Sequence, residues 1–273
     1  MLKERIITAL ILLLLFLAAL FMLPALAWAV LITVIVLQAS AEWSYLAKFS
    51  GKAAQAYWWL TLMLMCVMVW FDASTSAAQQ MVPHMMVYGL SLVLWLVVPV
   101  WLLVGWKIDL PPLMMLVGWA LLIPTGLAMM DLRQYSPWLL LGIMVLVWVA
   151  DSSAYFVGRK FGKNKLAPSI SPGKTWEGVI GALFGVSIYV VLVWSFSGYH
   201  QYYAFIPNIL LASWCWVGLA VLGDLFESAV KRQAGVKDSG SLLPGHGGLL
   251  DRIDALTSTL PLAAMAMLIQ KIP

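Results

Sequence analysis

The sequence predicts an all-α, polytopic integral membrane protein with about nine transmembrane helices. Three observations support this class: 63% of the 273 residues are hydrophobic, only 10% are charged, and the mean hydropathy is +0.94. Soluble domains carry about 25% charged residues, so these values exclude a water-soluble globule, and the large apolar surface excludes disorder. The apolar stretches are continuous rather than alternating at every second residue, which argues against an outer-membrane barrel.

The expected spans follow the charge-free stretches, because a helix needs about 20 apolar residues to cross the hydrocarbon core. The first run, residues 6–41, is too long for one span and contains Pro24, so we interpret it as a helical hairpin. The sixth, residues 137–150, is short, and we expect it to continue through Asp151 to about residue 157. The nine expected spans are residues 6–23, 25–42, 53–71, 85–106, 113–130, 137–157, 178–197, 206–223 and 255–270.

The chain divides by composition into two regions. Residues 1–136 hold spans one to five, and residues 137–273 hold the remaining spans together with two long polar segments, residues 158–178 and 223–254. These two segments carry nine of the sixteen basic residues, so we expect the C-terminal region to be catalytic. Neither an internal repeat nor a separate soluble domain is evident in the sequence.

The distribution of basic residues predicts the orientation in the membrane. If the N-terminus is cytoplasmic, fourteen basic residues face the cytoplasm and two face outward, as the positive-inside rule requires. We therefore expect a bacterial-type inner membrane protein, with both polar segments in the cytoplasm and the C-terminus outside. This bias accounts for the net charge of +4, so we expect no nucleic-acid partner. The fourteen are Lys3, Arg5, Lys48, Lys52, Lys107, Arg159, Lys160, Lys163, Lys165, Lys174, Lys231, Arg232, Lys237 and Arg252.

Acidic residues of the N-terminal region lie scattered near the ends of the expected spans. They are Glu42, Asp72, Asp109 and Asp131. We interpret all four as solvated loop or interface residues.

The first polar segment follows a helical carboxylate, Asp151, and contains a loop that suits phosphate binding. Asp151, Tyr155 and Gly158 share one helix face at i, i+4 and i+7, and basic residues follow them. The run Gly173-Lys174-Thr175 lacks the earlier glycine and the preceding strand of a Walker A motif, which excludes a P-loop. What remains is a short loop with Lys, Thr and backbone N–H groups before an apolar helix. Such a loop at a helix N-terminus can bind a phosphate group.

The second polar segment places carboxylates and cations on the same helix faces. Asp224, Glu227, Ser228 and Lys231 form one helical stripe, and Asp251 and Asp254 share a face at the start of the last span. Clustered carboxylates beside clustered cations suit Mg²⁺ and the phosphates that it bridges. A salt-bridged loop is the alternative, and it explains Glu227 with Lys231 but not the crowding of aspartates and His246 in a glycine-rich turn.

Residues 228–254 resemble the signature of the phosphatidate cytidylyltransferases. The residues that carry the resemblance are Ser228-Ala-Val-Lys231-Arg232, Lys237-Asp238 and Leu243-Pro-Gly-His246-Gly-Gly-Leu-Leu-Asp251-Arg252-Ile-Asp254, with Ser171–Gly178 and Asp151…Tyr155…Gly158 in support. The resemblance implies that CTP and phosphatidate react to give CDP-diacylglycerol and pyrophosphate. It also implies a Mg²⁺ site formed by Asp224 and Asp251, and a homodimer embedded in membrane lipid.

The remaining roles are assigned from residue type and the proposed chemistry. Lys231, Arg232, Lys237 and Arg252 are assigned as a group to phosphates, and Ser171, Lys174 and Thr175 to the nucleotide. Tyr155 and Ser228 are further substrate-binding candidates. For four residues two roles stay open: Asp238 and Asp254 support the cation or hold basic residues, His246 binds phosphate or orients its loop, and Asp151 binds a second cation or cytidine.

Two other classes of protein are consistent with many apolar spans. A secondary transporter or channel would place its ionisable groups near the membrane midplane, usually within repeated halves, whereas these groups cluster at one face. A CTP-using lipid kinase would share the cation site but would transfer the γ-phosphoryl group, so its product would be CDP rather than pyrophosphate.

Overall fold

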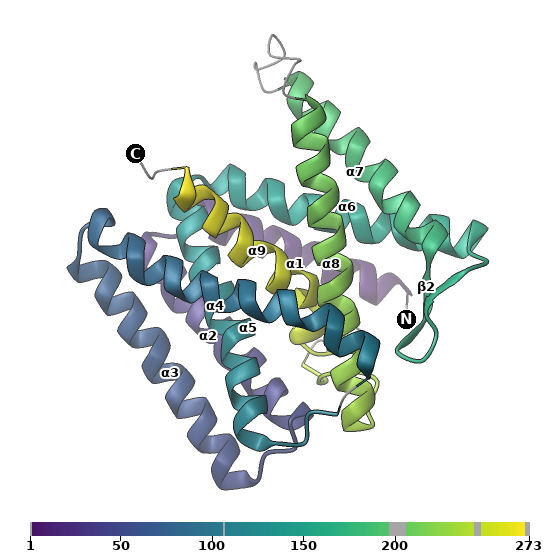
Figure 1. Ribbon diagram of the computed structural model, residues 1–273. Coiled ribbons are helices and arrows are strands. Elements are labelled where there is room, and N and C mark those ends of the chain that lie inside the picture. The colour runs from purple at the N-terminus through teal and green to yellow at the C-terminus, as the bar shows by residue number, and fades with distance from the viewer. Residues whose placement is uncertain (1, 106, 197–205, 243–246, 271–273) are drawn as a thin grey trace.

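The computed structural model describes residues 2–105, 107–196, 206–242 and 247–270, with side chains from residue 10 onward. Within these ranges the chain forms nine helices and one two-stranded sheet (Figure 1). The helices are α1 (Leu2–Met22), α2 (Ala25–Leu46), α3 (Gly51–Ser74), α4 (Ala77–Val104), α5 (Pro111–Tyr135), α6 (Pro137–Phe161), α7 (Trp176–Phe196), α8 (Ile206–Ala234) and α9 (Leu250–Ile269).

The helical class and the membrane-spanning character are confirmed. Among the described residues, α2 to α9 are each long and apolar enough to cross a membrane, and the apolar part of α1, Leu10–Met22, is shorter. α6 continues through Asp151 to Phe161, as expected from its short charge-free stretch. α8 extends beyond the expected span, to Ala234, so that the stripe from Asp224 to Lys231 is helical.

Proline and polar caps set where several helices begin. Pro24 separates α1 from α2, and Pro111 and Pro137 occupy the first positions of α5 and α6. Proline is tolerated there because the N–H that it lacks would have no acceptor within the helix. Ser76 opens α4 with a capping box to Gln79. These short, well-defined connections keep consecutive helices adjacent.

The core is built around α5 and α9. α5 packs against α2, α3, α4, α6 and α9, and α9 packs against α4, α5 and α8. Gly118 and Gly126 of α5 let α2 approach, since a Cβ at Gly118 would lie 2.4 Å from Trp43 and one at Gly126 would lie 2.6 Å from Val36. Such small residues at helix crossings are typical of membrane bundles.

A second packing unit is formed by α6, α7 and α8 (Figure 1). Its small buried core contains Ala150, Ala182 and Val217, one from each helix. α6 and α7 pack closely through glycine, because a Cβ at Gly181 would lie 2.5 Å from Val157. This contact holds the polar ends of α6 and α7 next to each other.

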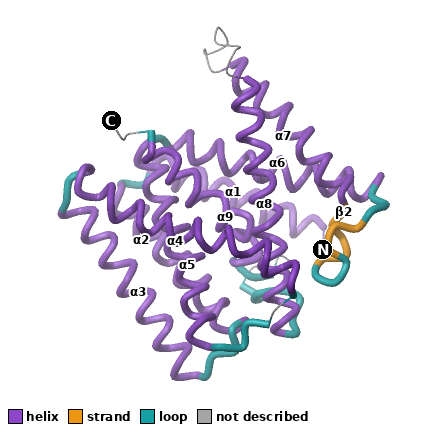
Figure 2. Tube along the Cα trace, in the orientation of Figure 1, coloured by secondary structure: helices purple, strands orange, loops and turns teal. Residues whose placement is uncertain are grey.

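One part of the fold was not anticipated. The segment expected as an irregular loop forms a small antiparallel hairpin, with β1 (Lys165–Ala167) paired to β2 (Ser171–Thr175) (Figure 2). The turn after Ala167 closes through Ile170 N–H to the Ala167 carbonyl at 3.2 Å. Arg232 of α8 reaches the Ile170 carbonyl at 3.3 Å, so the hairpin is attached to a second element.

The predicted orientation can be measured with single cysteines. In a variant lacking Cys66 and Cys215, cysteines at the exposed positions Lys163 and Ser241 should resist membrane-impermeant thiol reagents in intact cells. A cysteine at exposed Gln134, at the other end of the bundle, should react. The reverse labelling pattern would overturn the orientation derived from the basic residues.

Candidate active site

The two polar segments meet in one cavity of about 730 Å³. It lies between the C-terminal end of α6, the hairpin, the start of α7, the C-terminal half of α8 and the start of α9. Its polar lining residues are Asp151, Tyr155, Arg159, Lys165, Ser171, Lys174, Thr175, Asp224, Asp251, Arg252 and Asp254. The structure therefore brings together nine of the predicted site residues.

An ion pair between Lys174 and Asp224 connects the hairpin to α8. The ammonium Nζ of Lys174 lies 2.6 Å from Asp224 Oδ2, while Ser228 Oγ, one turn further along α8, donates to Asp224 Oδ1 at 3.2 Å. Asp151 and Asp254 lie within electrostatic reach of both partners. One lysine thus lies within electrostatic reach of three carboxyl groups on this side of the cavity.

Thr175 shapes the cavity through the start of α7. Its Oγ1 accepts a hydrogen bond from the Gly178 N–H at 3.1 Å, and the side chain is buried. The helix N-terminus is thereby capped by the chain itself, since the first N–H groups of a helix have no partner within it. Gly158 and Gly178 let this turn approach α6, because a Cβ on either would lie 3.0 to 3.2 Å from Thr175 Oγ1.

Asp251 is held from several sides at the start of α9. Lys231 Nζ lies 2.5 Å from Asp251 Oδ1 and 2.8 Å from Glu227 Oε2, so it bridges two carboxylates. Asp251 Oδ2 accepts from the backbone N–H groups of Ser239 and Gly248, both at 2.9 Å. Its exposed fraction is 8%, against 33% for Asp224.

Other predicted residues lie outside this cavity. Ser228, Lys231, Arg232, Lys237 and Asp238 are not among the described residues that line it. Arg232, Lys237 and Asp238 are exposed, and Lys237 and Asp238 border a separate surface pocket beside α2. Of the candidates inside the cavity, Tyr155 accepts a hydrogen bond from Arg159. His246 lies outside the described residues.

The oxygen atoms that line the cavity are of the kind that binds a hard divalent cation. Four carboxylates line it, and carboxylate oxygens are preferred ligands of Mg²⁺. The four carboxylates do not form a compact metal-binding cluster in this structure. Among the described residues, the three side chains whose ligand atoms lie within 4.8 Å of one another are Asp72, His84 and Asp131, which are not in the cavity. Because both oxygens of Asp251 already have partners in Lys231 and N–H donors, Asp224 is the more available of the two predicted ligands.

Two interpretations of acidic residues in the N-terminal region were wrong. Glu42 and Asp131 are buried rather than solvated, with exposed fractions of 6% and 9%. Asp131 accepts from Tyr88 Oη and faces His84 Nδ1, whose Nε2 faces Asp72 at 2.9 Å. Asp109 is exposed, as expected. A charge inside an apolar stretch is the signal that would have identified Glu42, because such residues are costly unless they are paired or functional.

Comparison with known proteins identifies the family of this chain. The model of the cytidylyltransferase family matches residues 3–270. A phosphatidate cytidylyltransferase of Pseudomonas aeruginosa is 36% identical over 97% of this chain and 96% of its own length, and that of Haemophilus influenzae is 34% identical over 96% of both chains. One from Bacillus subtilis is 44% identical over 48% of each chain. On these matches the chain belongs to the cytidylyltransferase family, and together with its long apolar helices they identify it as a membrane-embedded nucleotidyltransferase.

Proposed function

We propose that the chain transfers the cytidylyl group of CTP to phosphatidate, forming CDP-diacylglycerol and pyrophosphate at the cytoplasmic face of the inner membrane. The observation that carries this proposal is the single cavity that both polar segments share, joined by the Lys174–Asp224 pair. The named relatives support the choice of substrates. The homodimer implied by the sequence resemblance forms part of the same proposal.

The cavity has the amphipathic lining that a lipid phosphate requires. Arg159, Lys165 and Lys174 give it a basic rim, whereas Ala150, Ala182, Val217, Ala220 and Val221 line it further along their helices. Ala150 precedes Asp151 on α6, Ala182 follows Gly178 on α7, and Val217 precedes Asp224 on α8, so all three lie on the membrane side of the polar groups. A headgroup can meet the cations here while its acyl chains stay near hydrocarbon.

The reaction needs little acid–base chemistry from the protein. A phosphate oxygen of phosphatidate attacks the α-phosphorus of CTP, a new P–O bond forms, and the bond to the β-phosphate oxygen breaks as pyrophosphate leaves. The phosphomonoester is already largely ionised near neutral pH, so it can attack without a strong base. Catalysis then depends on positioning the two anionic substrates and on neutralising their charge.

Residues of this chain can supply both requirements. Lys174 on β2 is placed to contact the CTP phosphates, and Arg159, Lys165 and Arg252 are placed around the same cavity. Asp224, with Asp151, Asp251 and Asp254, would hold Mg²⁺, either as one ion or with a second cation. When bound, Mg²⁺ would offset negative charge on the triphosphate and on the departing pyrophosphate.

Product analysis tests the proposed function. Purified protein in mixed micelles, supplied with CTP, phosphatidate and Mg²⁺, should form CDP-diacylglycerol and pyrophosphate in equal amounts. Release of CDP together with a newly phosphorylated lipid would indicate a kinase. Absence of turnover, in protein shown to be folded, would contradict an enzymatic role for the cavity with these substrates.

A further inference from the structure

We propose that Glu42, on α2 in the N-terminal region, is a positioning residue of the active site. It would fix residues 239–240 and 248–249, which belong to the connection between α8 and α9, together with the first turn of α9, and so hold Asp251 in place. This inference rests on the function proposed above, because it gives a role to the carboxylate of Asp251. It also gives the N-terminal helices a direct part in assembling a site that is otherwise built from residues 150–254.

Glu42 is a buried carboxylate whose described partners are all hydrogen-bond donors. Its Oε1 accepts from the Leu249 N–H at 2.9 Å and from Gln38 Nε2 at 3.1 Å. Its Oε2 accepts from the Leu250 N–H at 2.8 Å and from Ser239 Oγ at 2.9 Å. No ion pair joins Glu42 to a cation within the described part of the chain. Burying a charge is costly unless donors compensate, so this carboxylate depends on the connection as much as the connection depends on it.

Glu42 performs the function of a helix cap for α9. The first N–H groups of a helix have no partner inside it, and Leu249 at the N-cap position has an apolar side chain that cannot accept. The carboxylate of Glu42 takes the N–H groups of Leu249 and Leu250 instead. A negative charge at this end of the helix also interacts favourably with the helix dipole.

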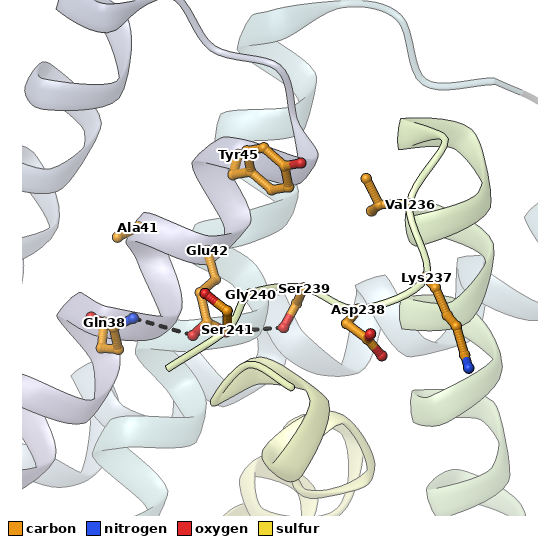
Figure 3. A pocket seen from close by; sticks show the side chains of 10 residues that line it. All are labelled: Gln38, Ala41, Glu42, Tyr45, Val236, Lys237, Asp238, Ser239, Gly240 and Ser241. Atoms are coloured by element: carbon orange, nitrogen blue, oxygen red, sulfur yellow. Dashed lines mark hydrogen bonds between the residues drawn. The ribbon is translucent and has the colours of Figure 1, made fainter. Parts of the chain in front are cut away.

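The connection approaches Glu42 so closely that Gly248 leaves no room for a side chain and Gly240 leaves little. A Cβ at Gly248 would lie 2.4 Å from Glu42 Oε2 and 2.2 Å from Ser239 Oγ, and a Cβ at Gly240 would lie 3.1 Å from the Glu42 carboxyl group. Figure 3 shows Gln38 and Glu42 on α2 facing Ser239 and Gly240 of the connection, with Lys237 directed away from them. The chain at Gly240 and Gly248 thus faces a carboxylate of α2.

Ser239 links Glu42 to Asp251. Its Oγ lies 2.9 Å from Glu42 Oε2 and 3.0 Å from Asp251 Oδ2, while its backbone N–H donates to the same Asp251 oxygen at 2.9 Å. Gly248, whose N–H also donates to Asp251 Oδ2, precedes the Leu249 N–H that Glu42 binds. Loss of the Glu42 acceptor would release both groups that hold this side of Asp251.

The test combines Glu42→Gln with kinetics and with amide hydrogen exchange. In either orientation, glutamine would turn its NH₂ group toward the N–H of Leu249 or of Leu250, so one of the two cap acceptors is lost while side-chain size is kept. Outer-shell partners of catalytic groups typically contribute about 10- to 100-fold, so kcat should fall by at least about tenfold. The KM for CTP should stay within about twofold, because Lys174 and the hairpin are untouched. Amides of residues 239–242 and 247–250 should exchange faster, and those of α7 should not.

Two further variants make the result specific. Ser239→Ala removes only the link between the two carboxylates, and its effect on kcat should be less than additive with that of Glu42→Gln, as expected within one network. Ser44→Ala is the matched control, because Ser44 is a buried polar residue of the same helix whose hydroxyl bonds only to the Ala41 carbonyl among described contacts. It should behave as wild type in both measurements.

Each contrary outcome has a definite meaning. Unchanged exchange in Glu42→Gln would show that Glu42 does not hold the connection, and faster exchange with unchanged kcat would show that holding it does not matter for turnover. Faster exchange throughout the protein, with CTP affinity also lost, would reduce Glu42 to a general structural residue. Any of these overturns the inference. If the wild-type protein makes no CDP-diacylglycerol, the proposed function fails, while the exchange data still decide whether Glu42 fixes the connection.

Discussion

Asp224→Asn is expected to abolish turnover while leaving a folded, membrane-inserted protein. Asp224 lines the cavity, paired with Lys174 and accepting from Ser228, and it is the more exposed of the two predicted cation ligands. Asparagine keeps the size of the side chain but removes its charge and one strong oxygen ligand. Losing a charged ligand of a catalytic cation costs several kcal/mol, which corresponds to a fall in kcat/KM of about 1,000-fold.

The control for this change is Asp109→Asn. Asp109 is also an acid of a short connection, but it is exposed and is not among the residues that line the cavity. Its variant should retain wild-type kinetics. Both proteins are compared by rate under saturating CTP, with Mg²⁺ varied, and by thermal unfolding in detergent. Near-normal activity of Asp224→Asn would remove this residue from the site, and rescue by excess Mg²⁺ would show that it contributes only to cation affinity.

Asp251→Asn should also inactivate the protein, for a reason that is partly structural. Asp251 Oδ1 pairs with Lys231, and Oδ2 accepts from the N–H groups of Ser239 and Gly248. An amide would leave Lys231 with Glu227 alone or would face the two N–H donors with a third donor. Asp224 is therefore the cleaner test of cation binding.

The helical framework could be predicted because each span is a continuous apolar stretch that is visible in the sequence. Charge-free stretches bounded by proline or charge correspond closely to α2, α5 and α6, and the short sixth stretch correctly indicated that Asp151 is helical. The hairpin at 165–175 was missed because its strands are three and five residues long and contain Pro172 and Gly173, which disfavour strands. Attachment to α8 through Arg232, a tertiary contact, helps to keep it in place.

The site was predictable where its residues share one helix and less so where they come from distant parts of the chain. The stripe containing Asp224 and Ser228 follows from helical spacing, and the hydrogen bond between them confirms it. The bonds from Ser239, Leu249 and Leu250 to Glu42 cross 197 to 208 residues, so spacing could not reveal them. The contact of His84 with Asp72 and Asp131 similarly joins three different helices.

Lys174→Gln separates phosphate binding from topology. Lys174 belongs to the basic residues that set the orientation, yet its side chain is only 22% exposed and its Nζ lies 2.6 Å from Asp224 Oδ2 in the cavity. If it contacts a CTP phosphate, glutamine removes a charge-assisted hydrogen bond of about 1.5–3 kcal/mol. The kcat/KM for CTP should then fall by about 10- to 100-fold, at about 1.4 kcal/mol per tenfold change. Arginine should restore only part of this loss, because its planar fork does not reproduce a compact ammonium group.

Lys163→Gln is the matched control for the same change. Lys163 lies in the same polar segment and counts equally toward orientation, but it is exposed and is not among the described residues that line the cavity. Its kinetics should match wild type. Initial rates in mixed micelles, with one substrate varied at a time, should show that Lys174→Gln weakens the response to CTP and leaves that to phosphatidate nearly unchanged. A defect confined to the response to phosphatidate would indicate that the hairpin binds phosphatidate rather than CTP. Wild-type behaviour of Lys174→Gln would mean that its pairing with Asp224 has no part in binding either substrate.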